Sequence, residues 1–335
     1  MIRKIDISHK TIFFIAGFLG LLWVLYQIRD VIILLFVAII FMSALSPYVE
    51  KMMTWRVPKA LAITIVYLVV ISLLGLLLIL VIRPLIEQTS NLTTSLPATL
   101  ETILPPGTIN RNLLEDRLGD FFGNVPNVIL TIFSNILAII SVTVLTFYLL
   151  IDKKRFERLL SQVFVPQQDR ARGIIEKIEE KLGAWLRGQI VLSIVIGTLS
   201  YLLLFALGVD YALPLAILAG VMEVVPVIGP IISAIPAVLI AYIINPPLAI
   251  AVAVGYFLIQ QLENNIIVPQ VMKRAVGLNP LVVIVAIAIG GRLLGISGAL
   301  LAVPITVLVQ IIAEELLNLD LGSRPLTKNN TPKSV

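Results

Sequence analysis

The sequence predicts an all-α polytopic membrane protein with about six full spanning helices and two re-entrant helical hairpins. Hydrophobic residues make up 59% of its 335 residues and charged residues only 13%, against roughly a quarter in soluble domains. Apolar runs of about 18 residues or more, long enough to cross a bilayer, recur along the chain. Two longer apolar runs, 213–244 and 281–312, are each interrupted near the middle by glycine and charged residues.

The first half of the chain contains four apolar runs that we expect to span the membrane: 11–28, 31–49, 60–82 and 128–151. Ser46-Pro47 is expected to end the second run and Arg83-Pro84 the third. The N-terminal unit, 1–82, therefore holds three spans, and 128–151 is the fourth. Between them, 83–127 combines prolines and acidic residues with leucines about four apart, which indicates an amphipathic extracytoplasmic segment beside the membrane.

The densest run of charge lies at 152–188. It places Ile178, Leu182 and Trp185 on one helical face among mixed charges, which favours a helix at the cytoplasmic surface. Basic residues concentrate on the cytoplasmic side of membrane proteins. The basic N-terminus, the loop 50–59 and 152–188 are therefore assigned to the cytoplasm, and the acidic 83–127 to the outside.

The second half, 189–314, is the predicted transport core, with spans at 190–207 and 248–268. The interrupted runs 213–244 and 281–312 exceed the roughly 20 residues of one span and fall short of two. Two helical hairpins that enter and leave on the same side fit that length, and they place Lys273 and Arg274 in the cytoplasm. Two long spanning helices, giving eight spans in all, are the alternative and would place these residues outside.

The hairpin arrangement makes two units of opposite orientation, an inverted repeat of the kind used by secondary transporters. Both termini are then cytoplasmic, and 315–335 is expected to be a disordered cytoplasmic tail. The expected location is the cytoplasmic, or inner, membrane.

A carboxylate lies inside the first interruption, at Glu223 in the stretch 220–236, GVMEVVPVIGPIISAIP. An acidic group at the membrane centre costs about 2.5–3.5 kcal/mol on insertion scales and is most often functional. Because loss of water favours the protonated form of a carboxyl group, Glu223 is a candidate proton carrier. The alternative is a structural cap on a helix end or hairpin tip.

A second polar cluster follows at Gln260, Glu263, Asn264 and Asn265. Gln260, Glu263 and Asn264 share a helical face, where they could coordinate a cation or hydrogen-bond a polyol. The alternative is that they end a helix and contact water. In the second interruption, Arg292 is a candidate to bind an anionic or hydroxyl-rich substrate, or to pair with Glu223 or Glu263.

Glycines and prolines in and around the interruptions are expected to permit close backbone approach and to leave carbonyl groups free for a ligand or ion. For any one of them, a helix kink that serves packing is the alternative. The set comprises Pro226, Gly229, Pro230, Pro269, Gly290, Gly291, Gly295, Gly298 and Pro304.

Composition excludes several other functions. The chain has no cysteine and one histidine, His9, so a thiolate or zinc site, a haem site and a Ser/His/Asp triad are not expected. A phosphate-binding GxxxxGK[ST] loop is absent from the sequence. The net charge of +5 is explained by positive-inside loops, with no nucleic-acid partner. We expect no enzyme activity, cofactor or metal.

Four motifs together resemble the autoinducer-2 exporter family, also called PerM-type permeases. They are EVVPVIGPIISAIP (223–236), QQLENNIIVP (260–269), GLNP (277–280) and GGRLLGISGALLAVP (290–304). The resemblance implies a multi-spanning transporter without an ATPase domain, assembled as a homo-oligomer, with a pentamer as one form. Some relatives are linked to autoinducer-2 export and others to sodium/proton exchange.

The sequence thus predicts a secondary transporter that exports a small polar solute such as autoinducer-2, coupled to protons or cations. A sodium (or lithium)/proton antiporter, a non-transporting membrane scaffold and a channel are the alternatives. The expected partners are the lipid bilayer, a small polar solute, and protons or sodium ions.

Overall fold

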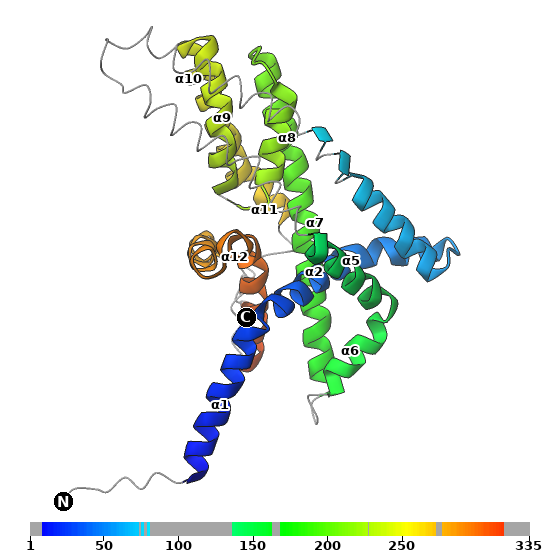
Figure 1. The fold of residues 1–335 in the computed structure, drawn as a ribbon. Helices are drawn as coiled ribbons and strands as arrows, with labels where there is room; N and C mark the ends of the chain where they lie inside the picture. The colour runs from blue at the N-terminus through cyan, green and yellow to red at the C-terminus, as the bar shows by residue number, and fades with distance from the viewer. Residues whose placement is uncertain are drawn as a thin grey trace, which may run out of the picture.

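The structure is a computed structural model, and it describes residues 9–73, 75–76, 79–80, 136–162, 168–226, 228–272 and 277–317. Every regular element within these residues is helical, which confirms the all-α prediction for this part of the chain (Figure 1). Four segments are long and apolar enough to cross a membrane: Arg29–Thr54, Gln168–Ala206, Pro246–Val271 and Leu281–Glu315. The number of spans and the inverted repeat stay predictions.

The labelled elements, in chain order, are α1 (His9–Gln27), α2 (Arg29–Thr54), α5 (Ile136–Ile151), α6 (Lys153–Gln162), α7 (Gln168–Ala206), α8 (Ala212–Met222), α9 (Ile228–Ile244), α10 (Pro246–Leu262), the π-helix η1 (Glu263–Ile267), α11 (Val268–Val271) and α12 (Pro280–Leu317). A further helix, Lys59–Leu73, lies between α2 and α5. The predicted segment 83–127 lies outside the described residues; of the predicted tail 315–335, residues 315–317 continue α12 and the remainder lies outside them.

Helix α2 continues through Pro47 to Thr54, so the end predicted at Ser46-Pro47 is wrong. Proline lacks the N–H that would bond the carbonyl four residues earlier, here that of Ser43. The guanidinium of Arg187 on α7 supplies a donor instead: its Nη1 donates to the carbonyls of Ser43 at 3.2 Å and Ala44 at 3.3 Å. A tertiary contact therefore satisfies the broken turn, and the helix persists.

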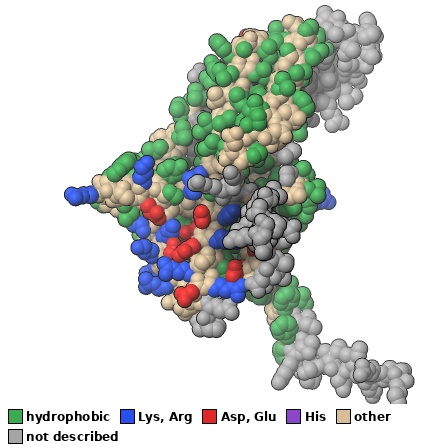
Figure 2. Space-filling view, turned by 180° about the vertical axis from the view of Figure 1, so that it is seen from behind, with side chains coloured by type: hydrophobic (Ala, Val, Ile, Leu, Met, Phe, Trp, Pro, Cys, Tyr) green, Lys and Arg blue, Asp and Glu red, His purple; other side chains and the backbone are tan. Residues whose placement is uncertain are grey.

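The described residues of the charged segment 152–188 form α6 and the first half of α7, and α7 runs on without a break into the apolar run that ends at Ala206. The sequence had divided these into a surface helix and a separate span. Leu182 and Trp185 are buried against Ile40 of α2 and against Leu301 and Val303 of α12, which holds the first half of α7 in the fold. Figure 2 shows charged side chains gathered below the elongated upper part of the molecule, on which hydrophobic side chains are numerous.

The first interrupted run is broken as predicted. Helices α8 and α9, of 11 and 17 residues, are separated by the turn that begins at Glu223, and they pack against each other. Each is shorter than the roughly 20 residues of a full span, as a hairpin requires. Helix α8 also packs along α7, and α9 along α10, so α7 to α10 form a four-helix group (Figure 1).

The second interrupted run, α12, is broken at Gly295, whose φ of 61° and ψ of −141° lie outside the helical region. Residues eight apart in a straight helix are about 12 Å apart. Here the backbone of Gly290 meets that of Gly298, so closely that a Cβ on either would collide with the other's carbonyl. The two halves of α12 therefore fold back on each other. Lys273 and Arg274, on which the membrane orientation of this hairpin depends, lie outside the described residues.

The return half of α12 is tied to the charged half of α7. Lys177 Nζ lies 2.9 Å from Glu314 Oε2, and Arg170 pairs with Glu315. The polar ends of these two helices therefore lie together, which agrees with their assignment to one side of the membrane.

Candidate functional site: a buried pair of carboxyl groups

Glu223 and Glu263 meet inside the four-helix group. Glu223 is the C-cap residue of α8 and 1% exposed, and Glu263 begins the π-helix η1 and is 3% exposed. Their carboxyl groups are close enough to interact electrostatically, although Glu223 Oε2 has no hydrogen-bond partner among the described residues. The structure therefore brings Glu223 together with Glu263.

Close packing of α7 on α8 fixes the position of Glu223. A Cβ added at Gly220 would lie 2.6 Å from the carbonyl oxygen of Ser193 and 3.3 Å from the Cα of Gly197, so the two helix backbones are in contact. Small residues at such a crossing are a common means of helix association in membranes, where the hydrophobic effect gives no net attraction. The contact sets the end of α8, and hence Glu223, against the middle of α7.

Gln189 of α7 binds the turn that carries Glu223. Its Nε2 donates to the backbone carbonyl of Glu223 at 2.6 Å, and the side chain is 2% exposed. Carbonyl groups at a helix end lack intrahelical donors, so this bond stabilises the break between α8 and α9. Gln189 is not among the predicted site residues, because it falls between the charged segment and the apolar run. The available clue was an amide at the start of an otherwise apolar stretch.

The π-helix determines which polar residues of the second cluster enter the site. A π-turn widens the helix locally, and such turns are frequent at functional sites. Glu263 points inward and accepts a hydrogen bond from Gln260 Nε2 at 3.1 Å. Asn264 and Asn265 are exposed, and Asn265 Nδ2 donates to the carbonyl of Gln261 at 2.7 Å. Pro269 is likewise exposed, so these three lie away from the pair.

The prolines and glycine of the first interruption lie beside Glu223. Pro226 is part of the turn, and Gly229 is packed so closely on the carbonyl of Met222 that no side chain could fit there. Pro230 is buried in the first turn of α9, where its carbonyl accepts a hydrogen bond from Ser233 Oγ at 3.0 Å. They shape the break that carries the carboxyl group.

The second interruption forms a separate feature. Gly290, Gly291, Gly295 and Gly298 belong to the fold-back of α12, which packs against α7. The expectation that Arg292 is buried and pairs with Glu223 or Glu263 is wrong: its side chain is exposed, and within the described part of the chain it forms no ion pair with either acid. The physical reason is that α12 folds back on itself at Gly295 and leaves Arg292 on its exposed side.

A model described as AI-2E family transporter matches residues 12–318. The chain belongs to this family. The AI-2 transport protein TqsA of Escherichia coli K12 is 32% identical to it over 301 residues, which cover 85% of this chain and 84% of TqsA. YrrI of Bacillus subtilis strain 168 is 28% identical over 305 residues, covering 85% of this chain and 86% of YrrI. The family resemblance seen in the sequence is thus confirmed.

In this AI-2E family member, the site has the chemistry of a proton-binding group. Two carboxyl groups held together away from water cannot both ionise without strong repulsion, so they favour a shared proton. Within the described residues, no cluster of three or more His, Cys, Asp or Glu residues is arranged to hold a metal ion. Gln260 donates to the carboxyl group of Glu263, and Gln189 holds the backbone of the turn at Glu223.

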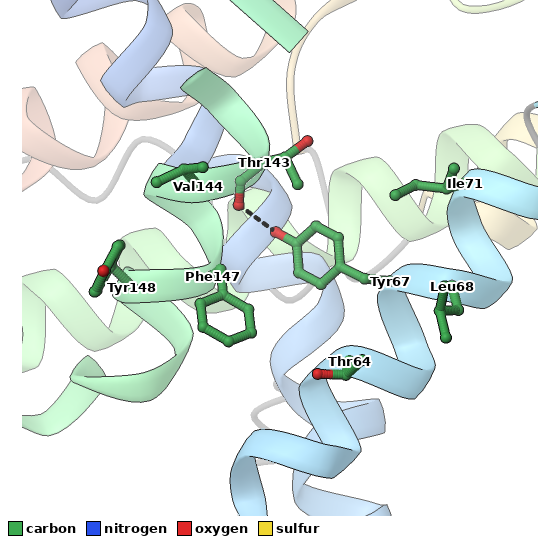
Figure 3. Close-up of a pocket in the computed structure, with 8 residues that line it drawn as sticks. All are labelled: Thr64, Tyr67, Leu68, Ile71, Thr143, Val144, Phe147 and Tyr148. Carbon is green, nitrogen blue, oxygen red and sulfur yellow. Dashed lines mark hydrogen bonds between the residues drawn. The ribbon is translucent and has the colours of Figure 1, made fainter. Parts of the chain in front are cut away.

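A groove of about 430 Å³ lies elsewhere, between helix Lys59–Leu73 and α5 (Figure 3). Tyr67 extends across it, and its hydroxyl donates to the carbonyl of Thr143 at 3.3 Å. The lining holds no predicted site residue; it consists of Thr64, Tyr67, Leu68, Ile71, Thr143, Val144, Phe147 and Tyr148. The groove is therefore separate from the carboxyl pair.

Proposed function

We propose that this protein is a secondary transporter that exports a small polar solute across the cytoplasmic membrane in exchange for protons bound at Glu223 and Glu263. The single observation that carries the proposal is the contact between these two buried carboxyl groups at a helix break. TqsA is named for AI-2 transport, so AI-2 is the first solute to test.

The position of the pair suggests how a proton is linked to movement. Glu223 belongs to the end of α8 and Glu263 to η1, so the two carboxyl groups lie on different helical elements. Two like charges about 4 Å apart repel by about 4 kcal/mol at an effective dielectric constant near 20. A bound proton removes this repulsion and favours the closed packing, whereas its loss favours separation of α8 from η1. Such a two-state element is what coupled transport requires.

Exchange of sodium or lithium ions for protons is the second candidate. Glu223 Oε2 is buried and has no hydrogen-bond partner in the structure. Carboxylate oxygens are ligands that hard cations prefer, so a dehydrated cation could take the place of the proton. Homo-oligomeric assembly also stays a prediction, and cross-linking of the protein in its membrane tests it.

The proposal is tested with the full-length protein in proteoliposomes that have an acidic interior. For one proton per solute, each unit of pH gradient drives about tenfold accumulation, since one unit corresponds to 1.36 kcal/mol. We expect gradient-driven accumulation of AI-2 by the wild type and its loss in Glu223→Gln and Glu263→Gln. Glu176→Gln is the matched control, because this α7 carboxylate is 57% exposed and, within the described residues, pairs with the neighbouring Arg172.

The same assay separates the alternatives. Accumulation of sodium or lithium in place of AI-2 would favour the antiporter, and the absence of any flux would favour a scaffold. Flux that does not saturate and ignores the gradient would favour a channel. Full gradient-driven accumulation by Glu223→Gln would contradict the role of the pair.

A further inference from the structure

Three apolar helices end at one junction. Helix α2 ends at Thr54, the next helix begins at Lys59, and α5 ends at Ile151, where the charged α6 follows (Figure 1). Lys59 Nζ donates to the carbonyl of Ile151 at 2.7 Å, and Lys153 Nζ of α6 donates to Ser46 Oγ of α2 at 3.1 Å. Membrane-spanning helices end where the hydrocarbon meets the headgroups, so we expect this junction to lie at that boundary.

The acids of the junction converge on one lysine. Lys153 Nζ lies 3.2 Å from Glu179 Oε2, 3.7 Å from Glu50 Oε1 and 4.0 Å from Glu157 Oε1. A further acid, Asp152, is exposed at the start of α6. The carboxylates held by Lys153 are therefore not engaged with the other cations of the junction.

Several of those other cations are exposed and form no ion pair among the described residues. They include Arg56, Lys154, Arg155 and Arg158. The last three share one side of α6, because residues three and four apart lie together on a helix, while α6 packs on α7. Leu159, on the same exposed side, is 55% exposed. Cations beside an apolar side chain on the outside of a helix are typical of a helix that lies on a membrane.

Arg56 occupies a position at which glycine is the usual residue. Its φ of 63° lies in the left-handed region. Its N–H donates to the carbonyl of Met53 at 3.0 Å, and the N–H of Val57 donates to that of Met52 at 3.4 Å. These two bonds form the Schellman motif, in which the left-handed residue is most often glycine. A side chain there costs stability, and such strain is commonly kept where it serves a function.

The same turn exposes an aromatic side chain. Trp55 directly precedes Arg56 and is 67% exposed. Tryptophan is enriched at membrane interfaces, where its ring lies at the level of the headgroups. An arginine guanidinium can bind a phosphate group through two parallel hydrogen bonds. The turn therefore presents an interface anchor and a phosphate-binding group next to each other.

We propose that the surface formed by Arg56, Lys154, Arg155 and Arg158 binds the phosphate headgroups of anionic phospholipids, with Trp55 in the interface beside them. Each cation close to an anionic membrane surface favours association about fivefold. Anionic lipids are concentrated in the cytoplasmic leaflet, the side to which 50–59 and 152–188 are assigned by their charge. These cations lie on α6 and at the end of α2, so lipid binding does not depend on the proton-binding role of the carboxyl pair.

Trp55 itself reports the lipid beside it, since bromine on an acyl chain quenches the fluorescence of a tryptophan that it contacts. The chain has three tryptophans; Trp185 is 4% exposed, and Trp23, which is 66% exposed, is removed by Trp23→Phe. The full-length Trp23→Phe protein is reconstituted in phosphatidylcholine that contains brominated phosphatidylglycerol or, at the same mole fraction, brominated phosphatidylcholine. We expect phosphatidylglycerol to be preferred at least about tenfold. Equal quenching by the two lipids would overturn the proposal.

Arg56→Gly separates lipid binding from folding, because the two roles predict different results. In the Trp23→Phe background we expect it to lower the preference for phosphatidylglycerol about fivefold. We also expect it to unfold in detergent no earlier than its parent, since glycine suits the left-handed turn. Arg172→Gln is the matched control and should keep the full preference, because this arginine is 65% exposed on α7 and pairs with Glu176. An unchanged preference in Arg56→Gly, or its earlier unfolding, would overturn the role of Arg56.

Two further arms test the α6 cations and the nature of the ligand. Arg155→Gln/Arg158→Gln should bring the two lipids to within about twofold of equal quenching, and a full preference in this variant would overturn the proposal. Glycerol phosphate is added against sodium chloride of the same ionic strength, because salt alone screens exposed charges. We expect the preference to persist. Its loss with glycerol phosphate but not with chloride would show a site for soluble phosphate and overturn the assignment to lipid.

Discussion

Replacing Gly220 by alanine perturbs the α7–α8 contact on which the carboxyl site is built. The added Cβ would lie 2.6 Å from the carbonyl oxygen of Ser193, where a comfortable contact between carbon and oxygen is about 3.3 Å. The helices must therefore separate by roughly 0.7 Å, and overpacking of this kind typically costs about 1–3 kcal/mol. The same displacement lengthens the 2.6 Å bond from Gln189 to the turn at Glu223.

Gly173→Ala is the matched substitution, because an added Cβ there meets nothing within 4 Å. It carries the helix-propensity gain of alanine over glycine without the clash. Unfolding is followed by heating the detergent-solubilised protein and measuring what remains folded on size exclusion. At about 2–4 °C per kcal/mol, we expect Gly220→Ala to unfold roughly 2–12 °C below Gly173→Ala. Equal midpoints for the two variants, with unchanged transport, would refute the close α7–α8 packing.

Arg187→Gln should destabilise the protein by about 1–3 kcal/mol, because it leaves the carbonyl of Ser43 unpaired. In a Pro47→Ala background the helix supplies its own donor, so the loss should shrink; equal losses in a double-mutant cycle would contradict this account. Burial lowers the pKa of Lys153, but neighbouring carboxylates, Glu179 first, raise it to above its ordinary value. Its stabilising contribution is therefore complete at neutral pH and lost as the pH rises through that raised pKa. Lys153→Met should cost about 1–2 kcal/mol at pH 7 and flatten the alkaline fall in thermal stability; an unchanged alkaline fall would count against the ion pair.

Sequence patterns predicted those parts of the structure that depend on local chemistry. Two apolar runs too long for one span and broken by glycine and proline correctly indicated the breaks at Glu223 and Gly295. The same patterns singled out Glu223 and Glu263 as the acids of the two polar stretches. A charge without a partner is costly in hydrocarbon. An acid inside an apolar run is therefore expected to face a polar partner or a cavity.

Features that depend on contacts between distant segments were not predictable in the same way. The continuation of α2 through Pro47 requires a donor from Arg187, 140 positions further along the chain. Gln189 was passed over because its role arises only when α8 ends beside it. Arg292 was assigned to the interior because its glycine-rich surroundings suggested burial, whereas the fold-back of α12 turns it outward.

The shared proton is the central claim, and infrared spectroscopy of the membrane-embedded protein measures it most directly. A protonated carboxyl group has a carbonyl stretch that is distinct from that of a carboxylate. We predict that wild-type protein and Glu176→Gln show a protonated-carboxyl band at neutral pH that disappears on alkaline titration. Glu223→Gln/Glu263→Gln should lack it. A neutral-pH spectrum in which the wild type and this double variant are the same would contradict the shared proton and the coupling built on it.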